Sequence, residues 1–170
     1  DSRIQQAAEK ALTHYDPQVK GAIVVMDCQT GDVLALASAP AFDPNLFAGH
    51  LPSSLYQPMI DPAGPKPLFN RATHGQYQPG STLKMIIGLA GLEEGLIDPV
   101  KTYQGEGYIM VGSRRIDDTA GAGLFDFERA FYKSSNAYFI HYGLQLGIAQ
   151  IVSWGERFFL GQETGLLPGQ

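Results

Sequence analysis

The spacing of apolar residues predicts a helix followed by a hairpin near the start of the chain. Apolar positions recur at helical intervals over residues 2–14. Two aliphatic runs, residues 22–26 and 33–37, flank a turn that contains Gly31, which is typical of a β-hairpin. The segment from residue 40 to 77 is rich in proline, and we expect it to be irregular.

Helical patterns dominate the rest of the chain. Polar positions are rare over residues 85–92, so a helix there is expected to lie inside a core. Amphipathic stretches follow at residues 126–131 and 138–146. The glycine-rich segment 103–125 lies between the apolar stretch 85–92 and the two amphipathic stretches. Within it only residues 108–111 resemble a small strand.

A last helix is predicted over residues 148–159, ending before Gly161. Its apolar residues Ile151, Val152 and Phe159 are expected to face a core. No internal repeat or low-complexity tract is present, which fits a chain that builds a single core.

Composition narrows the classes of function. At 170 residues, 44% hydrophobic and 17% charged, the chain is typical of a globular domain. Its net charge of −5 argues against a nucleic-acid partner, because phosphate binding needs a basic face. No apolar run is long enough to predict a membrane span. Cys28 is the only cysteine and is expected in a turn, and the scattered histidines predict neither a metal nor a cofactor.

Ser81 and Lys84 carry the clearest chemical signal. They follow Pro79 and Gly80 and open an apolar helical run. Positions three apart share one face of a helix, so the Lys84 amine can reach toward the Ser81 hydroxyl and act as its general base. Desolvation makes a lysine amine easier to deprotonate. The alternative is an N-capping serine followed by a solvated lysine.

A second motif, Ser134-Ser135-Asn136, lies on a tight connection between two amphipathic stretches. Taken alone, it fits a helix N-cap. Taken together with Ser81 and Lys84, it favours a serine that relays protons and an asparagine that holds a substrate amide.

The stretch Phe69–Lys84 closely resembles the nucleophile region of class B penicillin-binding proteins, above all the elongation-type branch, penicillin-binding protein 2. The resemblance also covers residues 20–27, 31–38 and 160–165. It implies an α+β, β-lactamase/transpeptidase-like fold, in which helices pack on an antiparallel sheet beside a mainly helical lobe.

The resemblance also implies an activity, that of a peptidoglycan D,D-transpeptidase. In that family a serine attacks the penultimate D-alanine carbonyl of a stem peptide and passes the acyl group to a neighbouring stem, and penicillins acylate the same serine. Carried over, Ser81 is the nucleophile, Lys84 the base, Ser134 the relay hydroxyl and Asn136 the substrate-amide ligand, without metal or cofactor.

The family's third motif, K-[ST]-G, is absent from these residues, and Lys101-Thr102-Tyr103 precedes Ser134 and lacks the glycine. That motif's strand supplies one oxyanion-hole donor in the family. We therefore expect the chain to be the first part of a transpeptidase domain, truncated at both ends. Residues 1–40 would give a helix and hairpin of the sheet, and residues 41–170 the mainly helical lobe. A missing segment or a second chain would complete the sheet.

Two other functions stay open at this point. One is a serine β-lactamase or penicillin sensor of the same fold. The other is a non-catalytic scaffold that binds cell-wall synthesis partners, because the third motif is missing. The family's setting implies a parent protein on the periplasmic or extracytoplasmic face of the bacterial inner membrane, with stem peptides, β-lactams, a membrane cell-wall polymerase and elongation-complex proteins as partners.

Two residue pairs near the motifs are expected to be structural. Asn70 and Arg71 precede the turn before Ser81 and are interpreted as framework. Asp117 and Asp118 lie in the glycine-rich segment, which could approach the cleft, but a solvated turn is the favoured interpretation.

Overall fold

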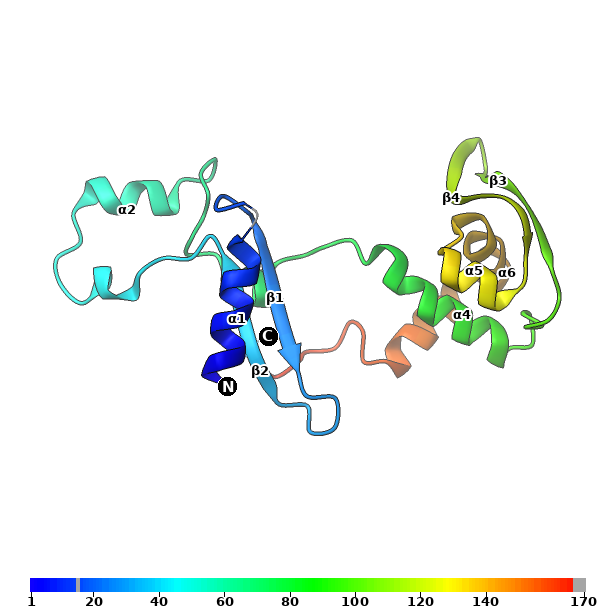
Figure 1. The fold of residues 1–170 in the computed structure, drawn as a ribbon, viewed down its shortest axis with the longest axis horizontal. Coiled ribbons are helices and arrows are strands. Elements are labelled where there is room, and N and C mark those ends of the chain that lie inside the picture. The colour runs from blue at the N-terminus through cyan, green and yellow to red at the C-terminus, as the bar shows by residue number, and fades with distance from the viewer. Residues whose placement is uncertain (15, 167–170) are drawn as a thin grey trace. The chain divides into compact units, whose positions relative to one another are not determined.

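The structure, a computed structural model, describes residues 1–14 and 16–166. They fall into two compact units that divide between Tyr77 and Gln78. Each unit has its own helices and strands (Figure 1) and its own clusters of buried side chains.

The first unit begins with helix α1 (Ser2–Thr13) and an antiparallel hairpin of β1 (Gly21–Met26) and β2 (Val33–Ala39). These are the helix and the two strands that the apolar pattern predicts. An irregularity in the pairing at Val25/Met26 marks the end of the hairpin next to the turn.

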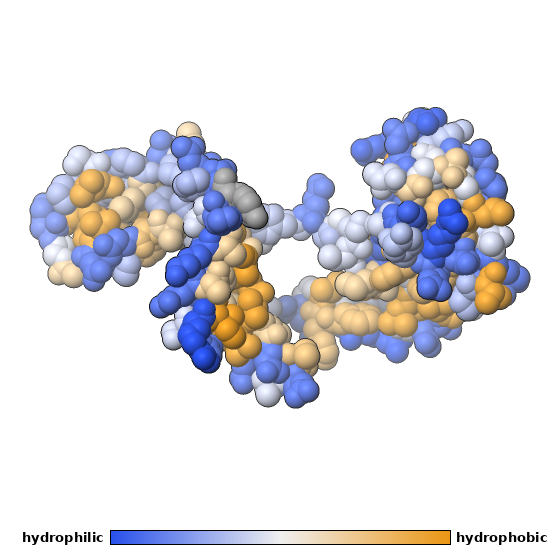
Figure 2. All heavy atoms as spheres, in the orientation of Figure 1, coloured by the Kyte–Doolittle hydropathy of each residue, from blue (hydrophilic) through white to orange (hydrophobic). Residues whose placement is uncertain are grey.

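Helix α1 packs on the hairpin through small side chains. Ala8 of the helix is buried against Ala35 and Ala37 of β2. Because alanine side chains are short, the helix can lie close to the strands. Val24 and Met26 of β1 stay exposed, so the hairpin carries apolar side chains that α1 does not cover (Figure 2).

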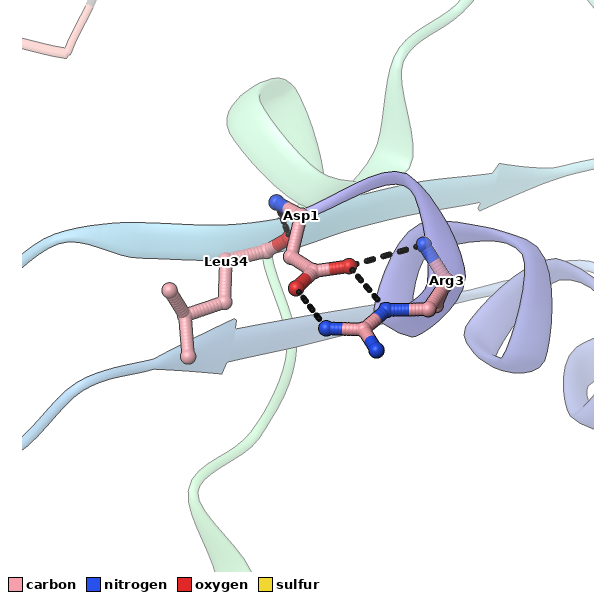
Figure 3. A network of polar contacts seen from close by, with 3 residues as sticks. All are labelled: Asp1, Arg3 and Leu34. Carbon is pink, nitrogen blue, oxygen red and sulfur yellow. Dashed lines mark hydrogen bonds and ion pairs between the residues drawn. The ribbon is translucent and has the colours of Figure 1, made fainter.

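The outer edge of β2 is closed by side-chain and terminal groups of α1. The Gln5 amide accepts from the Leu36 N–H at 2.7 Å and donates to the Leu36 carbonyl at 3.1 Å. The Asp1 amine donates to the Leu34 carbonyl at 3.0 Å, while its carboxylate caps α1 by accepting from the Arg3 N–H (Figure 3). Backbone groups that would otherwise be free at a strand edge are thereby paired.

The β1–β2 turn is held by Asp27. Its carboxylate accepts from the backbone N–H groups of Gln29 and Thr30 at 2.8 and 3.1 Å, and Gly31 adopts a positive φ of 79°. The left-handed region favours glycine, because it has no Cβ. Cys28 is exposed in this turn, as predicted.

The segment after β2 is more ordered than its proline content predicts. It contains a 3₁₀ turn η1 (Pro44–Phe47) and helices α2 (Ser53–Ile60) and α3 (Arg71–His74), so the prediction of a wholly irregular stretch was wrong. Pro52 and Asp43 immediately precede two of these elements, where an extended residue starts a helix.

Asn70 and Arg71 are framework residues, as predicted. The Asn70 side chain caps α3 by accepting from the Ala72 N–H at 3.0 Å. The buried Arg71 guanidinium donates to the backbone carbonyls of Pro65 and Lys66 at 2.8 and 3.1 Å. A buried guanidinium needs such acceptors, and here it ties the loop before α3 to the helix.

The second unit contains two helical layers and a long hairpin. Its elements are η2 (Gly80–Thr82), α4 (Leu83–Glu93), β3 (Tyr103–Val111), β4 (Arg114–Phe125), α5 (Phe127–Lys133) and α6 (Asn136–Arg157). The hairpin replaces the single small strand expected at residues 108–111. Its register pairs Gly105 with Gly123, and glycines at such positions remove the apolar alternation from which a strand is predicted.

The core of this unit lies where α4, α5 and α6 meet the hairpin. One cluster of buried side chains joins Ile97, Phe125, Tyr138 and Phe139, and another joins Ala90, Leu146 and Trp154. These clusters bury one face of α4 and the inner face of α6.

Only part of α4 is buried, which corrects the prediction that the helix lies inside a core. Gly88, Ala90 and Gly91 are buried, whereas Met85 and Leu89 are exposed. The exposed Met85 and Leu89 line an apolar groove of about 390 Å³ together with Phe158 and Leu160. Figure 2 shows apolar residues gathered along this part of the unit.

Helix α6 is broken at Gly147, whose backbone is not helical (φ 77°, ψ 160°). The break separates the two helical patterns predicted at 138–146 and 148–159. Of the residues expected to face the core, Val152 is half-exposed and Phe159 is 74% exposed, so that part of the prediction was wrong. Trp154 is buried instead and donates its indole N–H to Glu94 at 3.0 Å.

We expect Gly91→Ala to destabilise the protein. A Cβ at Gly91 would lie 2.5 and 2.8 Å from atoms of the buried Ile97 side chain. Overpacking of this kind costs about 1–3 kcal/mol, which exceeds the roughly 1 kcal/mol that alanine gains over glycine in a helix. The measurement is the free energy of unfolding in urea.

Gly143→Ala in α6 is the matched control. A Cβ there would meet its nearest neighbour at 3.7 Å, an ordinary contact, so helix propensity should raise stability by up to about 1 kcal/mol. Equal effects of the two substitutions would contradict the packing argument.

Candidate active site

The structure brings Ser81, Lys84, Ser134 and Asn136 together within the second unit. Ser81 lies on η2 and Lys84 in the first turn of α4, while Ser134 and Asn136 flank the connection between α5 and α6. Hydrogen bonds link these four side chains across about fifty positions of sequence. The two motifs therefore form one cluster.

Local backbone geometry presents Ser81 at the start of α4. Gly80 has a positive φ of 55°, a conformation that glycine adopts without a steric cost. Thr82 closes the turn, because its N–H and its hydroxyl both donate to the Pro79 carbonyl. Ser81 is exposed, so its hydroxyl is open to a substrate.

The α5–α6 connection presents Ser134 in a less common conformation. Ser134 has a φ of 55° and a ψ of 44°, in the left-handed region, which is rare for a residue with a Cβ. Two hydrogen bonds to the end of α5 hold this bend, because the Ser134 N–H donates to the Phe131 carbonyl and the Ser135 N–H donates to the Ala130 carbonyl. Strained conformations that neighbouring bonds maintain occur often at functional sites.

The Lys84 amine is the centre of the hydrogen-bond network. Nζ donates to the Ser134 carbonyl at 2.6 Å, to Ser134 Oγ at 3.0 Å and to Asn136 Oδ1 at 2.8 Å. Ser134 Oγ in turn donates to Ser81 Oγ at 3.0 Å. Over the residues that the structure describes, the amine reaches Ser81 through Ser134 and makes no direct hydrogen bond to it.

The surroundings favour loss of a proton from this amine. Burial lowers the pKa of Lys84, because a charged amine loses hydration there, and the negative charge of Asp118 partly opposes the shift. The three oxygens around Nζ are a carbonyl, a hydroxyl and a side-chain amide. None of them carries a charge that would hold the lysine protonated.

Asn136 uses both ends of its side-chain amide. Its oxygen accepts from Lys84, and Nδ2 donates to the Asp117 carbonyl at 3.2 Å. An amide nitrogen has two hydrogens, so one remains for a further acceptor. The side chain is half-buried, and its orientation is fixed by the lysine and by β4.

Asp118 is the site residue that sequence reasoning missed. It was interpreted as part of a solvated turn, but it lies on β4, is only 6% exposed and accepts from the Ser135 hydroxyl and from the N–H groups of Asn136 and Ala137. Burial raises its pKa, but these hydrogen bonds outweigh that effect and lower it overall. An aspartate in a glycine-rich segment gives no signal of such a contact, because the partner lies seventeen positions away.

The remaining chemistry of the described residues is simple. Over residues 1–14 and 16–166, no three histidine, cysteine, aspartate or glutamate side chains gather closely enough to hold a metal ion. Within the same residues, no helix has the length and hydrophobicity that crossing a bilayer requires. The geometry that is present, a serine joined through a second serine to a partly buried amine, suits nucleophilic acyl transfer.

Comparison with known proteins places this geometry in a family. The family model of the penicillin binding protein transpeptidase domain matches residues 21–169. The peptidoglycan D,D-transpeptidase MrdA of Acinetobacter baumannii is 36% identical over 89% of this chain and 23% of its own length.

Solved structures agree with the sequence match. The penicillin G acyl-enzyme complex of penicillin-binding protein A from M. tuberculosis superposes with a TM-score of 0.83 at 31% identity, covering 95% of this chain and 39% of that one. A chain from a peptidoglycan synthase complex, described for its coordination of polymerization and crosslinking, gives 0.83 at 36% identity and covers 97% and 32%.

The chain spans between 23% and 39% of the length of these three relatives. Its match to the family model nevertheless extends over nearly all of its residues, and its α+β fold is the fold of their transpeptidase domains. The chain belongs to the penicillin-binding protein transpeptidase family.

Proposed function

We propose that this chain carries the acylation centre of a peptidoglycan D,D-transpeptidase, with Ser81 as the nucleophile. The observation that carries the proposal is the chain of hydrogen bonds from Lys84 through Ser134 to Ser81. A serine needs a base to become nucleophilic, and these hydrogen bonds connect Ser81 to the partly buried Lys84 amine.

Proton movement follows from the geometry. A neutral Lys84 amine keeps two hydrogens, which suffice for the Ser134 carbonyl and Asn136 Oδ1. Its lone pair then faces Ser134 Oγ. Hydroxyl groups rotate, so Ser134 can pass its own proton to the amine while it accepts the proton of Ser81.

The acyl group then passes from the substrate to Ser81 and from Ser81 to a second amine. The Ser81 oxygen bonds to the substrate carbonyl carbon, and the amide C–N bond breaks. The departing nitrogen takes a proton from Ser134, which Lys84 replaces, so the products are a serine ester and a free amine. A second amine attacks the ester and restores Ser81 by the reverse path.

The names of the relatives support the substrate class. A relative named peptidoglycan D,D-transpeptidase suggests that the acyl donor is a stem peptide ending in D-alanine and the acceptor is an amine of a neighbouring stem. A relative that forms an acyl-enzyme with penicillin G suggests that β-lactams react at the same serine. The free hydrogen of Asn136 Nδ2 is placed to hold a carbonyl of either ligand.

The setting of the parent protein follows from the same class. Stem peptides lie outside the cytoplasm, so we place the domain on the extracytoplasmic face of the inner membrane. The relative from a peptidoglycan synthase complex supports a membrane cell-wall polymerase as a partner in elongation.

Benzylpenicillin should add its full mass to the intact protein, because opening a β-lactam releases no leaving group. We expect a stable adduct, seen by mass spectrometry of the intact protein, that is lost in Ser81→Ala. Ser113→Ala, which changes an exposed serine at the β3–β4 turn, is the control and should keep the adduct.

An adduct that survives Ser81→Ala would overturn the assignment of the nucleophile. An adduct that forms and is released within seconds would favour a β-lactamase over a transpeptidase. Absence of any adduct in the folded protein would favour a scaffold, or a chain that acylates only when the strand bearing K-[ST]-G is present.

The rate of acylation should rise with pH, because the neutral amine is the active form. The rate should level off above the pKa of Lys84, and since burial lowers that pKa, the plateau should begin below the ordinary lysine value of 10.5. The measurement is the acylation rate constant with a fluorescent penicillin across a pH series. A rate independent of pH, or one that rises only around the ordinary value, would argue against Lys84 as the base.

A further inference from the structure

Asp118 is bonded more heavily than any other carboxylate in the described part of the second unit. Its two oxygens accept from the Ser135 hydroxyl, from the Asn136 N–H at 2.8 Å, from the Ala137 N–H at 3.1 Å and from the Ala120 N–H at 3.1 Å. Ionised carboxylates accept up to about four hydrogen bonds, so its capacity is filled.

Three of the four donors, those of Ser135, Asn136 and Ala137, belong to the segment that carries the site residues. Ser135 lies between Ser134 and Asn136, and it is also the N-cap of α6, since its hydroxyl accepts from the Tyr138 N–H at 3.1 Å. Asp118 therefore binds the first turn of α6 at the point where the two catalytic side chains leave the backbone. A negative charge at a helix N-terminus is favourable in itself.

The same strand also fixes the Asn136 side chain. The Asp117 carbonyl accepts from Asn136 Nδ2 at 3.2 Å, next to the carboxylate that accepts from the Asn136 N–H. Both the backbone and the amide of Asn136 are thus tied to β4. Ser135 is fully buried, so water cannot replace the carboxylate there without leaving polar groups unpaired.

We infer that Asp118 is a positioning residue for acylation, which holds Ser134 and Asn136 against the Lys84 amine through the first turn of α6. The inference rests on the proposed function, and it adds a fifth residue to the machinery. Asp118 itself contacts neither Ser81 nor Lys84 by a hydrogen bond within the described residues, so it acts on the chemistry through its neighbours.

A carboxylate is required at this position by the number of donors. Asparagine has nearly the same shape but only one acceptor oxygen, and its NH₂ group would face donors. Asp118→Asn should therefore release part of the α6 turn without leaving a cavity. A displacement of about 1 Å in a catalytic group can cost about 10²-fold in rate.

The test is acylation by a fluorescent penicillin in the intact protein, followed by stopped flow so that initial binding and the acylation step are separated. We expect Asp118→Asn to lower the acylation rate constant by about 10- to 100-fold and to change the dissociation constant of the initial complex by less than about threefold. All measurements are made well below the melting temperature of each variant.

Asp126→Ala is the matched control for stability. Asp126 is another helix-capping aspartate of this unit and accepts from the Arg129 N–H at 2.8 Å at the start of α5. Its replacement should lower the melting temperature, as the loss of a helix N-cap does. The acylation rate constant should stay within about threefold of the wild-type value. Ser135→Ala, which removes one donor to Asp118, carries the test if Asp118→Asn does not fold, with an expected loss of about 5- to 20-fold.

Three outcomes separate the possibilities. The inference is supported if Asp118→Asn acylates more slowly with unchanged initial binding, while Asp126→Ala acylates at close to the wild-type rate. An Asp118→Asn protein that acylates at the wild-type rate, or an Asp126→Ala protein that loses as much rate, overturns it and leaves a purely structural cap. A wild-type protein that never acylates, even when the rest of the transpeptidase domain is present, refutes the proposed function, and the inference with it.

Discussion

The partial burial of the Lys84 amine is the constraint that shapes the site in the second unit. An amine removed from water needs acceptors for its hydrogens, because unpaired polar hydrogens are costly there. Ser134 supplies two of the three oxygens and Asn136 the third, and Ser134 offers both its carbonyl and its hydroxyl from the left-handed conformation that it adopts. Because no acceptor in direct contact is charged, the amine is held in place without being locked in its protonated form.

The chemistry of the site could be predicted from sequence because it lies in two short motifs. Ser81 and Lys84 are three positions apart on a helical run, and the contact between Ser134 and Lys84 follows from the resemblance of both motifs to one family. That the Lys84 amine makes no direct hydrogen bond to Ser81 within the described residues, and reaches it through the predicted relay Ser134, could not be predicted, because it depends on side-chain distances in the fold. The contact of Asp118 with Ser135 and Asn136 was missed for a similar reason, since the packing of α6 against β4, and not local sequence, brings them together.

The fold shows the same division between local and distant causes. Helix α1 and the first hairpin were predicted because their apolar spacing agrees with their packing. The β3–β4 hairpin was missed because glycines occupy positions where alternating apolar side chains would have revealed a strand. In α6 the sequence cannot show that Gly147 redirects the helix, and this is why Trp154, and not Val152 or Phe159, reaches the core.

The side chain of Gln5 makes the two edges of the first hairpin different. By occupying the donor and the acceptor of Leu36, it behaves as a single peptide unit of a neighbouring strand and ends the ladder on the β2 side. Among the described residues, no side chain makes hydrogen bonds of this kind to the backbone on the outer edge of β1. The edge of β2 at Leu36 therefore has no free backbone donor or acceptor for another strand, and a glutamine on a helix limits where this sheet can be extended.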